Sequence, residues 1–305
     1  MHVVITGARG LIGAALARSL RDAGHRVTGV TRSEPGPDEI QWSPAEQRLD
    51  PADLRGVDAV VHLAGEKIGF TSWTPSAIAE ARWTPDTKRR ILDSRVQGTT
   101  LIAETMADLD DGPRTLVSAS AIGYYGDRGD AALTEKSASG ELFLSHVCRA
   151  WEASADPARA AGHRVVHPRI GIVQTPRDGA LQRSLPLFRL GLGGPFGSGK
   201  QWWSWVMLAD VIGVLHHAVV NDGVVGPINV TAPEPVTNAE WTRTLGRVLG
   251  RPTVLPVPRF GPRLVFGEMA DELIYVSAKV LPEATMATGY RFRHPTLEAG
   301  LRSVL

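Results

Sequence analysis

Three glycines near the start of the chain have the spacing of a phosphate-binding turn. Gly7, Gly10 and Gly13 follow the apolar run 3–5 and open a segment with a helical pattern. Glycine at these places permits a tight turn, lets the backbone approach a diphosphate and lets the helix pack closely on the strand. The start of the helix adds unpaired N–H groups and positive dipole. We therefore predict a dinucleotide site that includes Gly7, Arg9, Gly10, Leu11, Ile12 and Gly13.

The end of the second predicted strand, 27–31, indicates which dinucleotide binds. Arg32 lies about 20 residues after Gly13, where an NAD site usually places an acidic residue on the ribose 2′-hydroxyl. A guanidinium together with the hydroxyls of Thr31 and Ser33 suits a 2′-phosphate instead. The sequence thus predicts NADP(H) in preference to NAD(H), although the neighbouring Glu34 is of the type that NAD sites use.

Three further predicted strands end in residues suited to the same site. The runs 57–63, 116–118 and 164–173 are apolar and β-branched. In parallel sheets, cofactors bind outside the carboxyl ends of the strands. The predicted cofactor-binding set therefore also contains Leu63, Ala64, Gly65, Ser118, Ala119, Pro168, Arg169 and Ile170.

Side chains able to move protons or hold a substrate lie next to these strand ends. The hydroxyls of Ser120 and Tyr124 could orient or protonate a substrate oxygen, although Tyr124 could equally pack against the cofactor. Glu66 is a candidate general base if it is buried. An arginine suits an anionic group, and aromatic side chains suit a sugar or another ring. The predicted catalytic residues are Ser120, Tyr124 and Glu66, and the predicted substrate contacts are Arg95, Tyr125, Trp203 and Trp205.

Histidine and cysteine patterns do not indicate a metal site or a hydrolase. His216 and His217 are adjacent, so they cannot share one helix face, and no His-Glu-x-x-His occurs. Cys148 is the only cysteine, which excludes an internal disulfide, and we expect it to be a small core residue. Ser120 lies between Ala119 and Ala121 and lacks the glycine elbow of a hydrolase nucleophile.

Strands that alternate with helices position these side chains. Helical patterns at 11–23, 92–106, 142–161 and 208–220 separate the apolar strands, and 228–230 is a further strand. Such alternation predicts an α/β fold, a doubly wound, Rossmann-like parallel sheet. The proline-rich tail carries two helical stretches without alternating strands, which indicates a smaller mixed α/β lobe. We expect residues 1–173 and 206–231 to form the dinucleotide-binding domain, and 174–205 and 232–305 the substrate-type lobe.

Composition restricts the partners. The chain has 305 residues, 43% hydrophobic and 21% charged, with a formal net charge of +1. A balance so close to zero does not favour nucleic acid or an anionic membrane as partner. No apolar stretch approaches the length of a membrane span, and the N-terminus carries no secretion-type leader. We therefore expect a cytoplasmic protein with a small-molecule substrate.

Several longer motifs resemble one family. They are 118–126, 143–152, 167–173, 199–206 and the tail segments 267–270, 280–282 and 289–292. Together they are similar to the atypical short-chain dehydrogenases/reductases of the "epimerase family" subgroup, whose C-terminal piece is a domain of unknown function. The resemblance covers essentially the whole chain and implies an NAD(P)-binding domain. It also implies a possible homodimer through helices at about 88–107 and 141–161, and Asp210 resembles a family aspartate that caps a helix.

The chemistry that the resemblance implies is incomplete here. Typical members use a serine with a Tyr-x-x-x-Lys pair, and Ser120 stands at the serine's place, but 143–148 contains neither tyrosine nor lysine. Tyr275 and Lys279 have the spacing but lie in the second lobe, so we take them as an accidental match. We expect an NADP(H)-dependent oxidoreductase or epimerase-like enzyme acting on a carbonyl or hydroxyl, including nucleotide-sugar substrates. The alternative is an NADP(H)-binding regulatory or interaction protein without turnover.

Overall fold

A mostly parallel sheet forms the centre of the computed structural model, which describes residues 1–69, 72, 74–80 and 82–305. The strand order is β13-β9-β6-β5-β1-β2-β3-β4, β7 pairs with β9, and only β3 and β4 run antiparallel. Its strands are β1 (His2–Thr6), β2 (Arg26–Thr31), β3 (Glu39–Ser43), β4 (Arg48–Leu49), β5 (Ala59–His62), β6 (Thr115–Ser118), β7 (Ser120–Ala121), β9 (Arg164–Ile170) and β13 (Gly226–Val230). The strand order reverses between β1 and β5, and the carboxyl ends on either side of such a point leave a crevice for a ligand.

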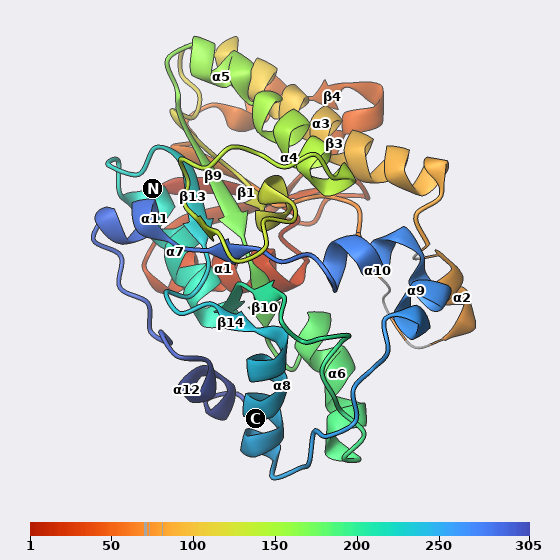
Figure 1. The fold of residues 1–305 in the computed structure, drawn as a ribbon. Coiled ribbons are helices and arrows are strands. Elements are labelled where there is room, and N and C mark those ends of the chain that lie inside the picture. Colours follow the sequence, from red (N-terminus) through yellow and green to blue (C-terminus); the bar gives the residue numbers. More distant parts are fainter. Residues whose placement is uncertain (70–71, 73, 81) are drawn as a thin grey trace.

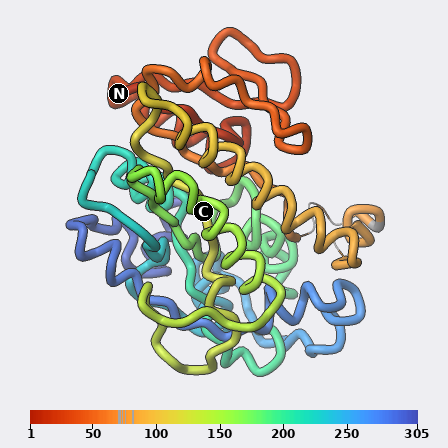
Figure 2. Tube along the Cα trace, turned by 90° about the horizontal axis from the view of Figure 1, so that it is seen from above, coloured from red at the N-terminus to blue at the C-terminus, as the bar shows by residue number. Residues whose placement is uncertain are grey.

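Helices cover both faces of this sheet (Figure 1). On one face, α1 (Leu11–Asp22) and α7 (Leu208–Val220) pack against Val3 and Ile5. On the other, α3 (Pro85–Ala107) and α5 (Asp156–Ala160) pack against Val4, with α4 (Phe143–Ala153) beside α3 (Figure 2). Successive side chains of a strand point to opposite faces, so a strand covered on both faces is apolar throughout. The doubly wound sheet predicted from the sequence is confirmed.

A smaller lobe lies at the carboxyl edge of the sheet, around α6 and α8 in Figure 1. Its core contains Trp203, Trp205 and Trp241. Small sheets join β10 to β12, β11 to β14 and β15 to β8. The elements outside the main sheet and the helices that cover it are β8 (Ala132–Leu133), β10 (Ile172–Gln174), α6 (Gly179–Arg189), β11 (Trp202–Trp203), β12 (Trp205–Met207), β14 (Val236–Thr237), α8 (Asn238–Leu249), α9 (Phe260–Phe266), α10 (Glu268–Leu273), β15 (Lys279–Val280), α11 (Glu283–Ala287) and α12 (Leu297–Arg302). Of these, α11 packs against β13 of the main sheet. The remaining elements are α2 (Pro75–Glu80) and the short 3₁₀ helices η1 (Pro44–Glu46), η2 (Pro51–Leu54) and η3 (Ile122–Tyr125).

Two elements expected to be continuous are divided. The helix expected over 142–161 is two helices, α4 and α5, which meet at Ser154 and Ala155. The strand expected over 164–173 ends at Ile170, and β10 leaves the main sheet to pair with β12. Gly171 lies at that division, where a Cβ atom would come within 2.6 Å of the Ser204 carbonyl oxygen. The close approach of two backbones explains a glycine there.

The tail is also richer in helices than expected, with α8 to α12 in place of two helical stretches. The strands β3 and β4, which extend the sheet beyond β2, were not predicted either. The domain division at 173/174, 205/206 and 231/232 remains a prediction. None of the described helices is long and apolar enough to cross a membrane.

Candidate functional site

The turn between β1 and α1 has a shape that only glycine permits at two positions. Gly7 has a φ of +68°, in the left-handed region. A Cβ atom on Gly13 would lie 2.2 Å from the Gly7 carbonyl oxygen, which no side chain could tolerate. Gly10 is the N-cap of α1, and no side chain caps the first turn of the helix. The free N–H groups of that turn and the absence of side-chain bulk fit a dinucleotide diphosphate.

A threonine hydroxyl ties the end of β5 to this turn. Thr6 Oγ1 accepts hydrogen bonds from the backbone N–H groups of Leu63, at 3.1 Å, and Ala64, at 3.2 Å. The same oxygen lies 2.7 Å from Nδ1 of the buried His62. A Cβ on Gly7 would sit 3.1 Å from the Ala64 nitrogen. The structure therefore brings together Gly7, Leu63 and Ala64, which the sequence assigned to one site from separate strands.

A second arginine, Arg9, contacts one of the residues predicted to hold a 2′-phosphate. Arg9 donates from Nη1 to Ser33 Oγ at 3.3 Å, and Ser33 Oγ lies 2.9 Å from Thr31 Oγ1. Its Nε also donates to Glu39 Oε1, at 2.9 Å. Arg32 is exposed at the end of β2. Two guanidinium groups thus stand near the end of β2, and Glu39, which the sequence analysis missed, occupies one of them.

Arg95 lies over the turn that follows β5. Its Nη2 donates to the Glu66 carbonyl oxygen at 3.1 Å, and its Nη1 to the Ile91 carbonyl oxygen at 2.9 Å. The guanidinium also stacks 5.0 Å from the Trp151 ring centre. A Cβ on Gly65 would be 3.3 Å from this guanidinium. The structure therefore places Gly65, Glu66 and Arg95 together, with the Glu66 side chain exposed rather than buried as a general base would require.

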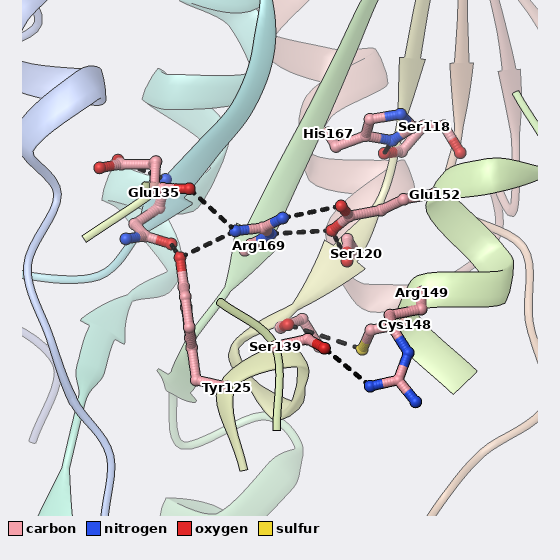
Figure 3. Close-up of polar contacts among 12 residues, drawn as sticks. Ser118, Ser120, Tyr125, Glu135, Ser139, Cys148, Arg149, Glu152, His167 and Arg169 are labelled. Carbon is pink, nitrogen blue, oxygen red and sulfur yellow. Dashed lines mark hydrogen bonds and ion pairs between the residues drawn. The ribbon is translucent and has the colours of Figure 1, made fainter. Parts of the chain in front are cut away.

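A nearly buried ion pair joins α4 to β9 (Figure 3). Arg169 donates from Nε and Nη2 to the two carboxylate oxygens of Glu152, each at 2.8 Å. The two side chains are 3% and 14% exposed. Ser120 Oγ donates to the same carboxylate at 2.7 Å. The Arg169 side chain thus forms a structural ion pair with Glu152, and the cofactor contact predicted for Arg169 remains a prediction.

The two adjacent tyrosines face different surroundings. Tyr125 is fully buried; its hydroxyl donates to Asn229 Oδ1 at 2.7 Å and accepts from Arg169 Nη1 at 3.0 Å. Burial raises the pKa of Tyr125 to about 12. Tyr124 is half-buried, with its ring 3.5 Å from the Arg169 guanidinium carbon. The Tyr125 side chain is thus closed off from solvent, and the substrate contact predicted for it remains a prediction. Within the part of the chain described, no hydrogen bond engages the Tyr124 hydroxyl.

The stripe of α4 that faces β7 and η3 carries no tyrosine or lysine. Leu144 and Cys148 are one turn apart on α4, and a Cβ on Gly123 would meet Leu144 Cβ at 3.1 Å and Cys148 Sγ at 3.9 Å. Glu152 continues the stripe and binds Ser120. Burial raises the pKa of Cys148 to about 11, so its thiol stays protonated near pH 7. The stripe thus offers no proton donor of the family's usual type.

The remaining predicted residues lie in the smaller lobe or at the ends of β6 and β9. Trp203 and Trp205 belong to the core of the smaller lobe, 6% and 0% exposed, and the substrate contacts predicted for them remain predictions. Tyr275 is not helical, and Lys279 lies over Trp202 at 4.4 Å. Four predicted cofactor residues line the ends of β6 and β9: Ser118, Ala119, Pro168 and Ile170, of which only Ile170 is not buried. No group of three or more metal-ligating side chains occurs among the described residues.

Asp210 differs from the expectation for a helix cap. The N-cap of α7 is Met207, and Asp210 lies inside the first turn of the helix. Its carboxylate is buried and accepts hydrogen bonds from the backbone N–H groups of Arg293, at 2.6 Å, and His294, at 3.1 Å. Asp210 therefore fixes the C-terminal segment to α7.

Two buried histidines beside the site predict acid sensitivity. Burial lowers the pKa of His62 to about 3 and that of His167 to about 4. The unfolded chain takes up these protons near pH 6.5, whereas the folded chain does not, so acidification favours unfolding. We expect the free energy of unfolding to fall by about 1.4 kcal/mol per pH unit for each histidine between about pH 6.5 and 4. Urea titrations at several pH values measure this slope. His62→Asn should flatten it, and an unchanged slope in that variant would contradict the assignment.

The sequence of this chain is similar to family models and to known proteins. The model of the NAD dependent epimerase/dehydratase family matches residues 3–230, and that of a domain of unknown function (DUF1731) matches 257–304. An epimerase family protein of Mycobacterium tuberculosis is 40% identical over 300 residues, 98% of this chain and 96% of that protein.

Two solved structures are also similar. The human epimerase family protein SDR39U1, solved with NADPH, has a TM-score of 0.88 and 35% identity, covering 100% of this chain and 99% of that one. A nucleoside-diphosphate sugar epimerase from Corynebacterium glutamicum has a TM-score of 0.80 and 36% identity, covering 100% of this chain and 58% of that one. The resemblance found in the sequence is confirmed.

Proposed function

The chain belongs to the NAD-dependent epimerase/dehydratase family, and from that premise we propose that it is an NADP(H)-dependent oxidoreductase or epimerase-like enzyme. The glycine turn and the uncapped start of α1 fit a dinucleotide. The similarity to a human protein solved with NADPH supports the phosphorylated cofactor. NADPH supplies a hydride when bound. Gly7, Gly10 and Gly13 would hold its diphosphate, and Arg9, Arg32 and Ser33 its 2′-phosphate.

We propose that the substrate is a carbonyl or hydroxyl compound, with nucleoside-diphosphate sugars as the first class to test. The similarity to a nucleoside-diphosphate sugar epimerase supports this choice. Arg95 lies beside Gly65 with a guanidinium that suits a phosphate or carboxylate. An arginine with its remaining N–H groups aimed at an anion would orient the substrate without taking part in the proton transfer.

One observation carries the proposed proton transfer, namely the unengaged hydroxyl of Tyr124. Ser120 is 2% exposed and bonded to Glu152, so we assign it a positioning role. Tyr124 lies four residues further along, and the buried Arg169 holds its ring at 3.5 Å. A tyrosine fixed in this way could donate a proton to the substrate oxygen during reduction and accept it back during oxidation.

Tyr124→Phe is expected to lower kcat/KM at least about 100-fold, because a positioned general acid contributes roughly 100- to 10,000-fold. Affinity for NADPH, measured by calorimetry, should change less than about twofold, since the ring and its contact with Arg169 remain. The assay is NADPH oxidation over a panel of carbonyl compounds and nucleoside-diphosphate sugars. Tyr275→Phe, in the smaller lobe, is the matched control. Equal activity of Tyr124→Phe and the unmodified protein would remove Tyr124 from the reaction.

A second candidate function is supported by the stripe on α4. Leu144 and Cys148 face η3, where a proton-transferring pair would be expected, and neither side chain ionises near pH 7. This favours an NADP(H)-binding regulatory or interaction protein without turnover. Tight NADPH binding combined with no turnover across the whole panel would favour this candidate over the enzyme.

The proposal also covers the cellular location of the protein and its oligomeric state. We propose that the protein acts in the cytoplasm, which its single cysteine is compatible with, although a relative from Arabidopsis thaliana is described as chloroplastic. We also propose a homodimer through α3 and α4, which lie side by side on one face of the sheet (Figure 2).

A further inference from the structure

A large cavity lies on the outer side of α1 and α7, away from the nucleotide turn. Its volume is about 1160 Å³, and its walls come from α1, α7, residues 174–177 and the C-terminal segment 289–294. In Figure 1 the dark blue chain between α11 and α12 runs down beside α7. None of the residues assigned above to cofactor or substrate lines this cavity.

Four arginines converge on the cavity from three parts of the chain: Arg18, Arg177, Arg291 and Arg293. All four are exposed, and within the described residues no hydrogen bond, ion pair or ring contact engages their guanidinium groups. The only lining residue with an acidic side chain is Asp22. Some exposed arginines elsewhere in the chain pair with carboxylates, as Arg55 does with Asp111. We call this cavity the arginine groove.

The C-terminal wall of the arginine groove is anchored firmly. Arg293 and His294 donate their backbone N–H groups to the buried carboxylate of Asp210, and His294 Nδ1 lies 3.0 Å from the same carboxylate. A Cβ on Gly213 would come within 2.2 Å of the Tyr290 hydroxyl, so the segment approaches α7 as closely as a glycine allows.

The anchoring also directs the two arginines outward. Tyr290, Phe292 and His294 are half-buried, whereas Arg291 and Arg293 are exposed. The alternation turns both guanidinium groups away from the core, and both line the cavity. Their backbone is therefore held before any ligand arrives, which lowers the entropy cost of binding.

We propose that the arginine groove binds a phosphorylated small molecule with two or more linked phosphate groups. Guanidinium groups match phosphate oxygens with paired, charge-assisted hydrogen bonds. Four of them around one cavity favour a multiply charged anion over a single carboxylate. The volume of about 1160 Å³ is slightly larger than the roughly 300–1,000 Å³ of typical small-molecule sites, so a small molecule would fit. The apolar side chains of Leu208 and Ile212 in the wall offer room for an uncharged part of the ligand.

Calorimetry with inorganic tripolyphosphate tests the proposal on the full chain saturated with NADPH, so that the nucleotide turn is occupied. We expect one site, and at least about tenfold weaker binding of inorganic monophosphate, because fewer charge-assisted bonds form. The double variant Arg291→Gln/Arg293→Gln should weaken tripolyphosphate binding at least about 30-fold. Arg18→Gln, on a separate element, should weaken it by about threefold or more. Arg48→Gln, exposed on β4, is the matched control and should not change it.

Several outcomes would overturn the proposal: no heat with tripolyphosphate, equal binding by the double variant and the unmodified protein, or an equal loss in Arg48→Gln. Tighter binding of polyglutamate than of tripolyphosphate would overturn it in favour of an acidic protein partner. Melting temperatures of the variants show whether they are folded. NADPH affinity should be the same in all of them. A failure of tripolyphosphate binding is therefore distinguishable from a failure of the proposed function, which would appear as a loss of NADPH binding or of turnover. If NADPH itself does not bind, the same titration is made on the cofactor-free chain.

Discussion

Replacing Arg169 with methionine is expected to lower the free energy of unfolding by about 3–5 kcal/mol, because removal of one partner leaves a buried charge without compensation. The Glu152 carboxylate would lose both of its bonds to the guanidinium and keep only the hydroxyl of Ser120. The Tyr125 hydroxyl would lose a donor as well. Chemical denaturation followed by fluorescence and circular dichroism measures this change.

A second substitution separates the charge from the packing. In Arg169→Met/Glu152→Leu neither charge remains, and replacement of a buried pair by apolar residues is often close to neutral. We therefore expect the double variant to recover most of the loss. Arg55→Met, which removes an exposed pair with Asp111, is the control and should cost less than about 1 kcal/mol. A loss of that small size in Arg169→Met would show that the ion pair is not structural.

The sequence revealed the parts of the site that depend on local geometry. The spacing of Gly7, Gly10 and Gly13 predicts the turn because Gly7 has a positive φ, and a Cβ atom on Gly10 or Gly13 would crowd the Gly7 carbonyl oxygen within the same few residues. The ends of β5 and β6 were predicted for a similar reason, since apolar runs followed by small residues mark strand ends. Parallel pairing then brings these ends to one edge.

The remaining features depend on partners distant along the chain. Asn229 binds Tyr125 from 104 residues away, and no periodic pattern signals such a pairing. Glu152 sits in a motif that the sequence analysis noticed, but its partner Arg169 lies on another element and was assigned to the cofactor. The sequence also does not distinguish an aromatic residue that fills a core from one that lines a cleft, and Trp205, which is buried in a core, is an example.

Arg32→Glu is expected to weaken NADPH binding about 100-fold and to change NADH binding less than about threefold. The 2′-phosphate would lose a charge-assisted partner and meet a like charge, a combined effect of about 3 kcal/mol. The NADH ribose has no such phosphate to lose. Arg9→Gln should weaken NADPH binding less, because Arg9 must share its guanidinium with Glu39. Calorimetry of the unmodified protein and both variants with both nucleotides gives the dissociation constants that the comparison needs.

Arg26→Glu separates this local effect from the change in net charge, since Arg26 is an exposed arginine at the opposite end of the same strand, β2. It makes the same charge change away from the phosphate site and should leave both affinities unchanged. A uniform loss of NADPH and NADH binding in Arg32→Glu would indicate damage to the turn rather than to phosphate recognition. Preference of the unmodified protein for NADH would leave the fold and the glycine turn intact and overturn only the role of the arginines, because the diphosphate is common to both nucleotides.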